Sequence, residues 1–250
     1  MGHTGRSAYE SVHPAAPCGH RGVALQSGYN LSHAVPVYEG YVLPHAIVRL
    51  HVGGADLEQY LLKLLTEKGY SFTRATEAGL VRDIQQLSYV ASNFKEALSG
   101  PVQPTIIRLP DDTEIELGAE LSCCPELLFN PKLNDITGAD GIHTADGIHT
   151  TIFNSIMKCD PEIHRDLYPN IVVSGTNTMF NGLRERLMKE LHALAPEHED
   201  HMKIICEPNR KYSAWIGGAI LAPSLDDKTG WVSRSEYEEV GPTIVHQKCF

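Results

Sequence analysis

The stretch Gly22–His33, GVALQSGYNLSH, decides how the chain begins to fold, because two apolar runs flank a short turn. GVAL precedes the turn and LSHAVPVYEGY follows it, and both runs are typical of β-strands. Ser27, Gly28, Tyr29 and Asn30 between them have the composition of a hairpin turn. Such a turn directs backbone N–H groups outward, where they can hold a phosphate. The stretch therefore fits either a nucleotide clasp or an ordinary hairpin corner.

Two further stretches repeat the order of strand, glycine-containing turn and following structure. The first is HVGGADLEQYL (residues 51–61), in which glycines precede a helix, and a helix N-terminus attracts anions. The second is VVSGTNTMFNGL (residues 172–183), where a strand, a glycine turn and the start of a helix follow one another. Taken singly, each stretch is more typical of a structural turn than of a binding site.

Helical and strand patterns alternate along the rest of the chain, which predicts an α/β fold. Helices are expected at residues 57–68 (ended by Gly69), 77–98, 125–131, 151–158, 182–195 and 213–222. Strands are expected as a hairpin over residues 105–117 and singly at 170–174 and 203–206. Ser233 and Glu236 form a capping box for a last short helix, which Gly241 and Pro242 end before a tail, TIVHQKCF.

Composition and charge exclude several classes of protein. The 250 residues carry a net charge of -10 with scattered Lys and Arg, which argues against nucleic-acid binding. No apolar run reaches the roughly 18 residues that cross a membrane, so membrane insertion is not expected. The N-terminal segment lacks the apolar region of a secretory signal. The six cysteines include no C-x-x-C pair, which favours reduced thiols over a zinc site or a disulfide framework.

The hexapeptide ADGIHT occurs twice in tandem, at residues 139–144 and 145–150. Its aspartates and histidines are residue types that bind metals. Neither copy offers three ligands on a rigid element, however, and a duplication that lengthens a surface loop explains the repeat without a function. We therefore predict no metal site here.

Six longer stretches give the chain a specific resemblance to a known family. They are VPVYEGYVLPHAIVRL (35–50), LLTEKGYSFT (64–73), TIFNSIMKCD (151–160), RDLYPN (165–170), RKYSAWIGGAILA (210–222) and GPTIVHQKCF (241–250). In these stretches the sequence closely resembles the actin family, and the resemblance covers about residues 19–250. It implies an α/β fold of the actin and sugar-kinase ATPase type, in which two lobes enclose an ATP cleft.

The resemblance also implies how the chain divides. Residues 18–52 and 142–209 resemble the inner α/β domain of the second lobe, and residues 53–141 resemble its small outer domain. Residues 210–250 resemble the C-terminal segment that packs on the first lobe in actins. The first lobe itself is expected to be absent, and residues 1–17 are expected to form an unrelated flexible tail. The chain thus resembles a truncated, divergent actin.

Eight positions match residues of the actin nucleotide cleft. The residues that the resemblance implies as nucleotide contacts are Ser27, Gly28, Gly54, Arg82, Gly175, Met179 and Lys211. His33 matches the histidine near the attacking water, and is the candidate catalytic residue.

Other positions of the cleft depart from the actin pattern. Gln26 replaces the acid that helps order the water shell of the bound cation, and a neutral amide adds no charge there. Tyr29 and Asn30 replace an acid and a glycine, and their bulk narrows the approach to the backbone that glycine allows. The remaining departures are Gln85 and Gln86 at a lysine–glutamate pair, Thr176 at a glycine and Phe180 at a tyrosine. ATP or ADP with Mg²⁺ is therefore expected to bind only weakly.

The main hypothesis is an actin-like cytoskeletal protein of the cytoplasm, with weakened ATP binding, that acts through actin-type contacts with actin or actin-binding proteins. Actin-type hydrolysis of ATP is not expected, because one lobe alone does not enclose the phosphates. Apolar side chains of the C-terminal segment, including Trp215, Ile220 and Trp231, are expected to be exposed and to favour association. Two alternatives stay open: a weak ATP-binding module or ATPase, and a degenerate actin copy without a selected function.

Overall fold

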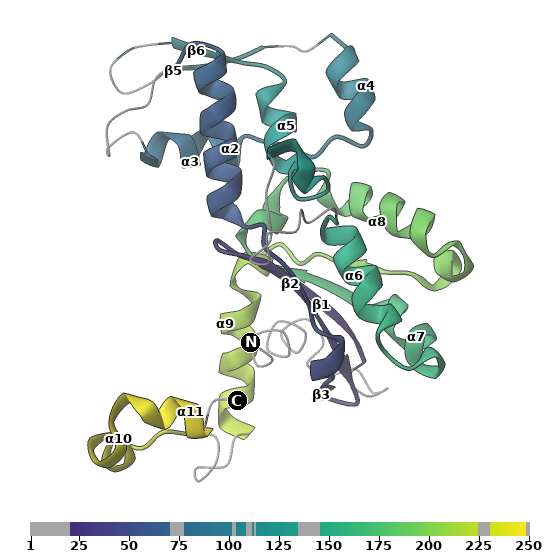
Figure 1. The fold of residues 1–250 in the computed structure, drawn as a ribbon, viewed down its shortest axis with the longest axis vertical. Coiled ribbons are helices and arrows are strands. Elements are labelled where there is room, and N and C mark those ends of the chain that lie inside the picture. The colour runs from purple at the N-terminus through teal and green to yellow at the C-terminus, as the bar shows by residue number, and fades with distance from the viewer. Residues whose placement is uncertain are drawn as a thin grey trace.

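The computed structural model describes residues 21–70, 78–101, 104–108, 112, 114–134, 146–224 and 231–248. A mixed sheet lies at the centre of this part of the chain, with a largely helical layer at one end and the C-terminal helices at the other (Figure 1). The predicted N-terminal tail and the first copy of the ADGIHT repeat lie outside the described residues. No helix in the described ranges is long and apolar enough to cross a membrane.

The sheet is built around the predicted hairpin. Its strands are β1 (Gly22–Ser27), β2 (Ser32–Tyr38), β3 (Tyr41–Val42), β4 (Val48–Leu50), β7 (Ile171–Ser174) and β8 (Ile204–Ile205). β1 and β2 pair antiparallel, whereas β1 pairs in parallel with β7 and β7 with β8. The order is β3-β2-β1-β7-β8, and β4 adds to β2. The parallel pairing of β1 with β7 brings the glycine turns that follow these two strands to the same edge of the sheet.

One face of the sheet is covered by helices that lie between residues 148 and 194 of the chain. These are α6 (Ile148–Met157), α7 (Pro161–Leu167) and α8 (Leu183–Leu194). α6 lies against β1, β2 and β4, with α7 and α8 beside it (Figure 1). Ile152 and Leu187, from the apolar stripes of α6 and α8, are fully buried with Val23 and Leu25 in one core. The helices predicted at 151–158 and 182–195 are therefore confirmed.

The described part of the second ADGIHT copy, residues 146–150, contributes Ile148 to this core. α6 begins at Ile148, inside the repeat, so the prediction of a surface loop is wrong for these residues. Ile148 is fully buried, its N–H donates to the carbonyl oxygen of Leu128, and the ring of His149 stacks on Phe129 at 5.8 Å between centroids. Burial of the apolar position of the repeat explains why helix forms here.

The largely helical layer is made by the chain between β4 and α6. It contains α2 (Gly54–Glu67), α3 (Ala78–Gln86), α4 (Phe94–Ser99), α5 (Glu120–Glu126) and the hairpin of β5 (Thr105–Arg108) and β6 (Glu114–Leu117). α2 buries Leu57, Leu61 and Leu65 on one face, as predicted from their spacing. Gly69, with φ of +99°, follows the end of this helix. The predicted hairpin is confirmed by the pairing of β5 with β6.

The single helix predicted for residues 77–98 is wrong, because α3 and α4 are separate. Between them, the N–H of Tyr89 donates to the carbonyl oxygen of Leu121 at 3.1 Å. The N–H of Val90 likewise donates to Asn181 at 2.8 Å. These N–H groups bond to distant segments in place of the carbonyl four residues earlier, so the helix is interrupted. The apolar periodicity continues across the interruption, which is why the sequence alone suggests one helix.

The boundary of α5 also differs from the prediction. A helical segment was expected at 125–131, but α5 begins at Glu120 and ends at Glu126. The chain then continues in turns, in which Leu128 and Phe129 donate to carbonyl groups three residues earlier. The tighter turns keep the apolar side chains buried without continuing the α-helix.

The C-terminal part contains α9 (Ser213–Leu221), α10 (Arg234–Val240) and α11 (Val245–Lys248). The predicted capping box is confirmed: Ser233 Oγ accepts from the N–H of Glu236, whose carboxylate accepts from the N–H of Ser233. The predicted tail TIVHQKCF is wrong for its described part, residues 243–248, which belongs to η9 (Gly241–Ile244) and α11. Lys248 Nζ fixes this helix by donating to Trp231 O at 2.6 Å and to Glu236 Oε1 at 2.7 Å.

Candidate functional site

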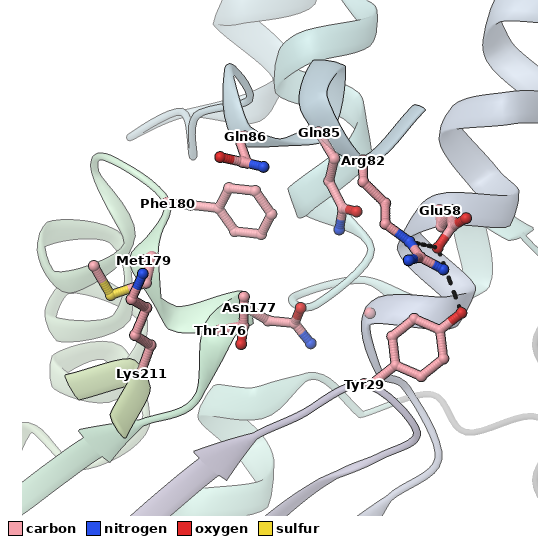
Figure 2. A pocket seen from close by; sticks show the side chains of 11 residues that line it. Tyr29, Glu58, Arg82, Gln85, Gln86, Thr176, Asn177, Met179, Phe180 and Lys211 are labelled. Carbon is pink, nitrogen blue, oxygen red and sulfur yellow. Dashed lines mark hydrogen bonds and ion pairs between the residues drawn. The ribbon is translucent and has the colours of Figure 1, made fainter. Parts of the chain in front are cut away.

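A pocket of about 690 Å³ lies where the sheet meets the helical layer, beside the ends of β1 and β7 (Figure 2). Crevices at the carboxyl ends of parallel strands are common ligand sites in α/β proteins, and this volume suits a small organic molecule. Four of the eight residues predicted from the sequence line the pocket: Gly54, Arg82, Met179 and Lys211. Five of the seven positions noted as departures also line it, namely Tyr29, Gln85, Gln86, Thr176 and Phe180, whereas Gln26 and Asn30 do not.

Ser27 and Gly28 do not line the pocket but hold its floor together. Ser27 is fully buried, and its Oγ lies 2.7 Å from Ser32 Oγ on the neighbouring strand. Asn177 Nδ2 donates to Ser27 Oγ at 3.1 Å and to the carbonyl oxygen of Gly28 at 2.7 Å. Asn177, which the sequence analysis missed, thus ties the turn after β7 to the turn after β1. In the sequence, Asn177 lies in a glycine-containing turn after a strand, and that position could have identified it as a residue of the site.

Gly175 has a backbone role in the same junction. Its φ is +97°, and a Cβ at this position would collide with the carbonyl oxygen of Ser27. Only glycine adopts this conformation without strain and also permits so close an approach. Gly175 therefore lets η5 (Thr176–Met179) follow β7 directly. Two pocket residues named in the sequence analysis, Thr176 and Met179, belong to η5.

The N-terminus of α2 is already occupied by the hairpin turn. The N–H of Gly54 donates to the carbonyl oxygen of Gly28 at 3.0 Å, and the N–H of Ala55 donates to Tyr29 at 2.9 Å. The N–H of Gly53 donates to the carboxylate of Asp56 at 2.8 Å. These groups are the donors with which a helix N-terminus binds an anion. The N–H groups of Gly53, Gly54 and Ala55, in the stretch HVGGADLEQYL that could attract an anion, are therefore hydrogen-bonded within the chain.

A three-residue contact closes the same side of the pocket. Glu58, on α2, accepts a hydrogen bond from Arg82 Nε at 3.1 Å, through the same oxygen that lies 3.4 Å from the Tyr29 hydroxyl. The guanidinium also lies over the Tyr29 ring, 5.8 Å from its centroid. The hydrogen bond to Glu58 raises the pKa of Arg82. Figure 2 shows the three side chains converging, so that the charge of Arg82 faces a carboxylate. Glu58 lies one helical turn after Gly54, and that spacing could have identified Glu58 as a pocket residue from the sequence.

The opposite side of the pocket is less charged and partly apolar. Met179 and Phe180 follow β7, and Lys211 comes from η7 (Arg210–Tyr212). Lys211 Nζ lies 4.7 Å from the centroid of the Tyr212 ring. Figure 2 shows the Phe180 ring below the carboxamide of Gln86, facing the same space as Gln85. This side therefore offers a planar surface and neutral groups that both donate and accept hydrogen bonds.

His33, the candidate catalytic residue, is not among the residues that line the pocket. It lies on β2 opposite Gln26, and only 7 % of its surface is exposed. Within the described chain, neither ring nitrogen of His33 nor Oε1 of Gln26 has a hydrogen-bond partner. Burial lowers the pKa of His33, and the charge of Arg49 on β4 lowers it further. Both effects favour the neutral form of the imidazole, which lies beneath the hairpin turn.

The fold and the pocket together define an α/β protein of the actin type. A sequence model of the actin family matches residues 4–250, and the chain belongs to the actin family. The match begins at residue 4, inside the segment for which a tail was predicted.

Members of this family bind ATP or ADP with Mg²⁺, and the described residues fit only part of such a ligand. Met179, Phe180 and Lys211 offer surroundings for a base. On the side of the pocket formed by α2 and α3, the N–H groups of Gly54 and Ala55 are hydrogen-bonded within the chain, and Arg82 pairs with Glu58. The described residues contain no group of three His, Cys, Asp or Glu that could hold a metal ion. The pocket therefore offers an aromatic and apolar wall that suits a base, and the described residues form no cluster that suits Mg²⁺.

Proposed function

We propose that this actin-family protein is cytoskeletal, acts in the cytoplasm through actin-type contacts with actin or actin-binding proteins, and binds ATP or ADP with Mg²⁺ only weakly. The observation that carries the proposal is the exposed apolar surface of the C-terminal helices. Its members are Tyr212, Trp215, Ile220, Trp231, Val232, Tyr237 and Val240. Trp215 alone is 77 % exposed. Large apolar surfaces that are exposed to solvent are typical of sites that bind other proteins.

The arrangement of the elements supports the division proposed for the chain. Residues 18–52 and 142–209, proposed as the inner domain, include the central sheet with α6 to α8. Residues 53–141, proposed as the outer domain, include α2 to α5 and the β5–β6 hairpin. Residues 210–250 include α9 to α11, which extend away from the helical layer (Figure 1). The exposed apolar surface thus belongs to the segment proposed to pack on another lobe or partner.

Co-sedimentation with actin filaments tests the proposed protein contacts. The protein is expected in the pellet with filaments, or to displace an actin-binding protein from them, and Trp215→Ala is expected to weaken either effect. Ile106→Ala is the matched control, because Ile106 is 65 % exposed but lies on β5, at the other end of the molecule (Figure 1). Absence of both co-sedimentation and competition would contradict the proposal.

A weak ATP-binding module or ATPase is the second candidate, favoured by the pocket itself. Four residues matched to the actin cleft line it, so a nucleotide has a place to bind. Titration with labelled ATP and Mg²⁺, followed by measurement of phosphate release, separates the two functions. Binding with hydrolysis supports the second candidate, and no binding at millimolar ATP removes it.

A further inference from the structure

The dipeptide Asn181-Gly182 lies at the surface of the molecule, directly before α8. Asn181 is exposed and Gly182 is half-buried. Gly182 is the N-cap residue of α8 and has a φ of +79°. Within the described ranges of the chain, neither the carboxamide of Asn181 nor the N–H of Gly182 has a hydrogen-bond partner. No contact with another described residue therefore holds these two neighbouring groups back from reacting with each other.

The reaction open to this pair is an intramolecular attack of the main chain on the side chain. Hydroxide removes the proton from the N–H of Gly182, and the nitrogen then adds to Cγ of Asn181. The new N–Cγ bond forms as the Cγ–Nδ2 bond breaks, and ammonia leaves with a proton taken from water. Water opens the resulting succinimide at either carbonyl carbon, which gives an aspartate or an isoaspartate. Glycine favours the attack because it has no Cβ to hinder the approach.

Two other asparagines in the same segment lack this combination of features. Asn177 is only 4 % exposed, and its carboxamide is hydrogen-bonded to the hairpin turn after β1. Asn170 is half-buried. The residues that follow them, Thr178 and Ile171, are β-branched, and both of their N–H groups donate hydrogen bonds to carbonyl oxygens. The segment therefore contains its own controls for a reaction at Asn181.

The main chain at Asn181 joins α8 to the helical layer. Its carbonyl oxygen accepts a hydrogen bond from the N–H of Val90 at 2.8 Å, and it forms a parallel bridge with Tyr89. The approach is close, because a Cβ on Gly182 would collide with the carbonyl oxygen of Val90. An isoaspartate adds a methylene group to the main chain and turns this carbonyl into a free carboxylate. The preceding residue, Phe180, faces the pocket, so the change also reaches the pocket wall (Figure 2).

We propose that Asn181 is a site of spontaneous deamidation in the folded protein, and that isoaspartate at this position breaks the contact with Val90 and loosens the joint between α8 and the helical layer. The reaction consumes only water and releases ammonia. It goes beyond the proposed function, because it requires neither a filament nor a nucleotide. The fraction of modified chains therefore increases with the age of the protein.

Tryptic peptide mapping of the folded full chain, kept in solution for increasing times, tests the site. Cleavage after Arg165 and Arg184 releases one peptide that contains Asn181 and both control asparagines. Deamidation at Asn181 is expected to be about tenfold or more faster than at Asn170 or Asn177. It should also accelerate as the pH rises, because the attacking nitrogen must first lose its proton. Equal rates at the three positions, or a reaction at Asn181 that occurs only in urea, would overturn the proposal.

The variant Asn181→Gln tests the chemistry. It keeps a carboxamide at the exposed position but moves it away from the attacking nitrogen, so ring closure loses its favourable geometry. Deamidation at position 181 is expected to be lost, while the rates at Asn170 and Asn177 stay constant. Asn93→Gln is the matched control before α4 and is expected to leave the reaction at Asn181 unchanged. An equal rate at position 181 in Asn181→Gln would exclude this mechanism. A thermal melt checks that both variants fold, and the wild-type mapping stands without them.

Amide hydrogen exchange at Val90 tests the structural consequence. The isoaspartate form, separated from aged protein, is expected to lose protection at Val90 and to keep it at Val173 in the central sheet. Asn181→Asp adds the negative charge without changing the course of the main chain. It is expected to keep protection at Val90, because a carboxylate is favourable next to a helix N-terminus. Full protection of Val90 in the isoaspartate form would refute the loosening of the joint.

Discussion

Gly175 joins the two turns that form the floor of the pocket. Its φ of +97° and the nearby carbonyl oxygen of Ser27 leave no space for a side chain. Gly175→Ala is therefore expected to lower the free energy of unfolding by about 2–4 kcal/mol, from backbone strain and displacement of β1. Urea unfolding followed by circular dichroism measures the loss.

Gly79 supplies the matched control for that substitution. It lies in α3, and a Cβ there would meet no atom within 4 Å. Gly79→Ala is expected to be neutral or to stabilise by up to about 1 kcal/mol, because alanine favours the helix. Equal effects of the two substitutions would show that the junction tolerates a side chain at Gly175.

Burial of His33 is expected to make the stability of the folded chain depend on pH. Because burial lowers its pKa in the folded chain, the unfolded chain binds the extra proton first, below the ordinary pKa of 6.5. Stability is therefore expected to fall as the pH drops from 7 to 5, by up to about 1.4 kcal/mol per pH unit for this one group. His33→Gln should make the fall shallower, and the exposed His45→Gln should not. Denaturant unfolding across this pH range measures both slopes, and equal slopes for wild type and His33→Gln would refute the assignment.

At the scale of the elements, an ion pair joins α8 to α5. Arg186 forms two hydrogen bonds with the Glu126 carboxylate, at 2.9 and 3.0 Å, and also donates to the carbonyl oxygen of Ala91. Both side chains are at least 90 % buried. Burial raises the pKa of Glu126, whereas Arg186 acts to lower it. Since α5 belongs to the helical layer and α8 covers the sheet, the pair connects the two parts of the molecule.

Replacing one partner of the Arg186–Glu126 pair is expected to lower the stability of the chain more than replacing both partners. Arg186→Met leaves Glu126 buried without a cation and should destabilise the chain by about 3–5 kcal/mol. Arg186→Met combined with Glu126→Met should recover much of that loss, because no charge remains buried. Arg234→Met, which breaks the exposed pair with Glu238, should change stability by under about 1 kcal/mol. A double-mutant cycle in urea measures these values, and a single-variant loss no larger than that of the exposed pair would contradict them.

The pair of Glu236 and Lys248 holds α10 and α11 together. The hydrogen bond from Lys248, with those from Ser233, lowers the pKa of Glu236 to about 2, from an ordinary value of 4.5. The contact is therefore complete above pH 4.5 and is expected to be lost as the pH falls toward 2. Lys248→Met should move the release of α11 to higher pH. Amide hydrogen exchange in α10 and α11 reports the midpoint, and an unchanged midpoint in the variant would argue against this pair.

Sequence reasoning succeeded for elements whose pattern is local. The hairpin of β1 and β2, the stripe of α2 and the capping box at Ser233 follow from residues a few positions apart. It failed where distant backbone groups decide the structure, as at Val90, whose N–H bonds to Asn181 and interrupts the predicted helix. Apolar periodicity indicates which side chains are buried, but it does not indicate which carbonyl group accepts a hydrogen bond from a given N–H.

For the whole molecule, the same limit applies to the pocket. Matching positions identified Gly54 and Arg82 as pocket residues, and both line it. Their donors are nevertheless paired with Gly28 and Glu58, and only the three-dimensional arrangement reveals that pairing. A sequence comparison marks where a site lies more readily than which of its groups are free to bind.

The distribution of apolar surface predicts how the whole chain behaves in solution. The exposed residues of α9 and α10 are expected to make the chain associate as its concentration rises. Trp215→Ala should reduce that association without lowering the melting temperature, because Trp215 is 77 % exposed. Sedimentation velocity over a concentration series tests this, and a wild-type chain that stays monomeric throughout would contradict it.

Two main-chain hydrogen bonds join the hairpin turn to α2, from Gly54 and Ala55 to Gly28 and Tyr29. Hydrogen bonds of this kind do not depend on which side chains the turn carries. The identity of the residues at positions 29 and 30 can therefore drift while the scaffold keeps its shape. In a saturation mutagenesis library, many substitutions at these two positions are expected to leave the chain folded while they change which ligands the pocket binds. Ligand preference can therefore diversify without loss of the fold.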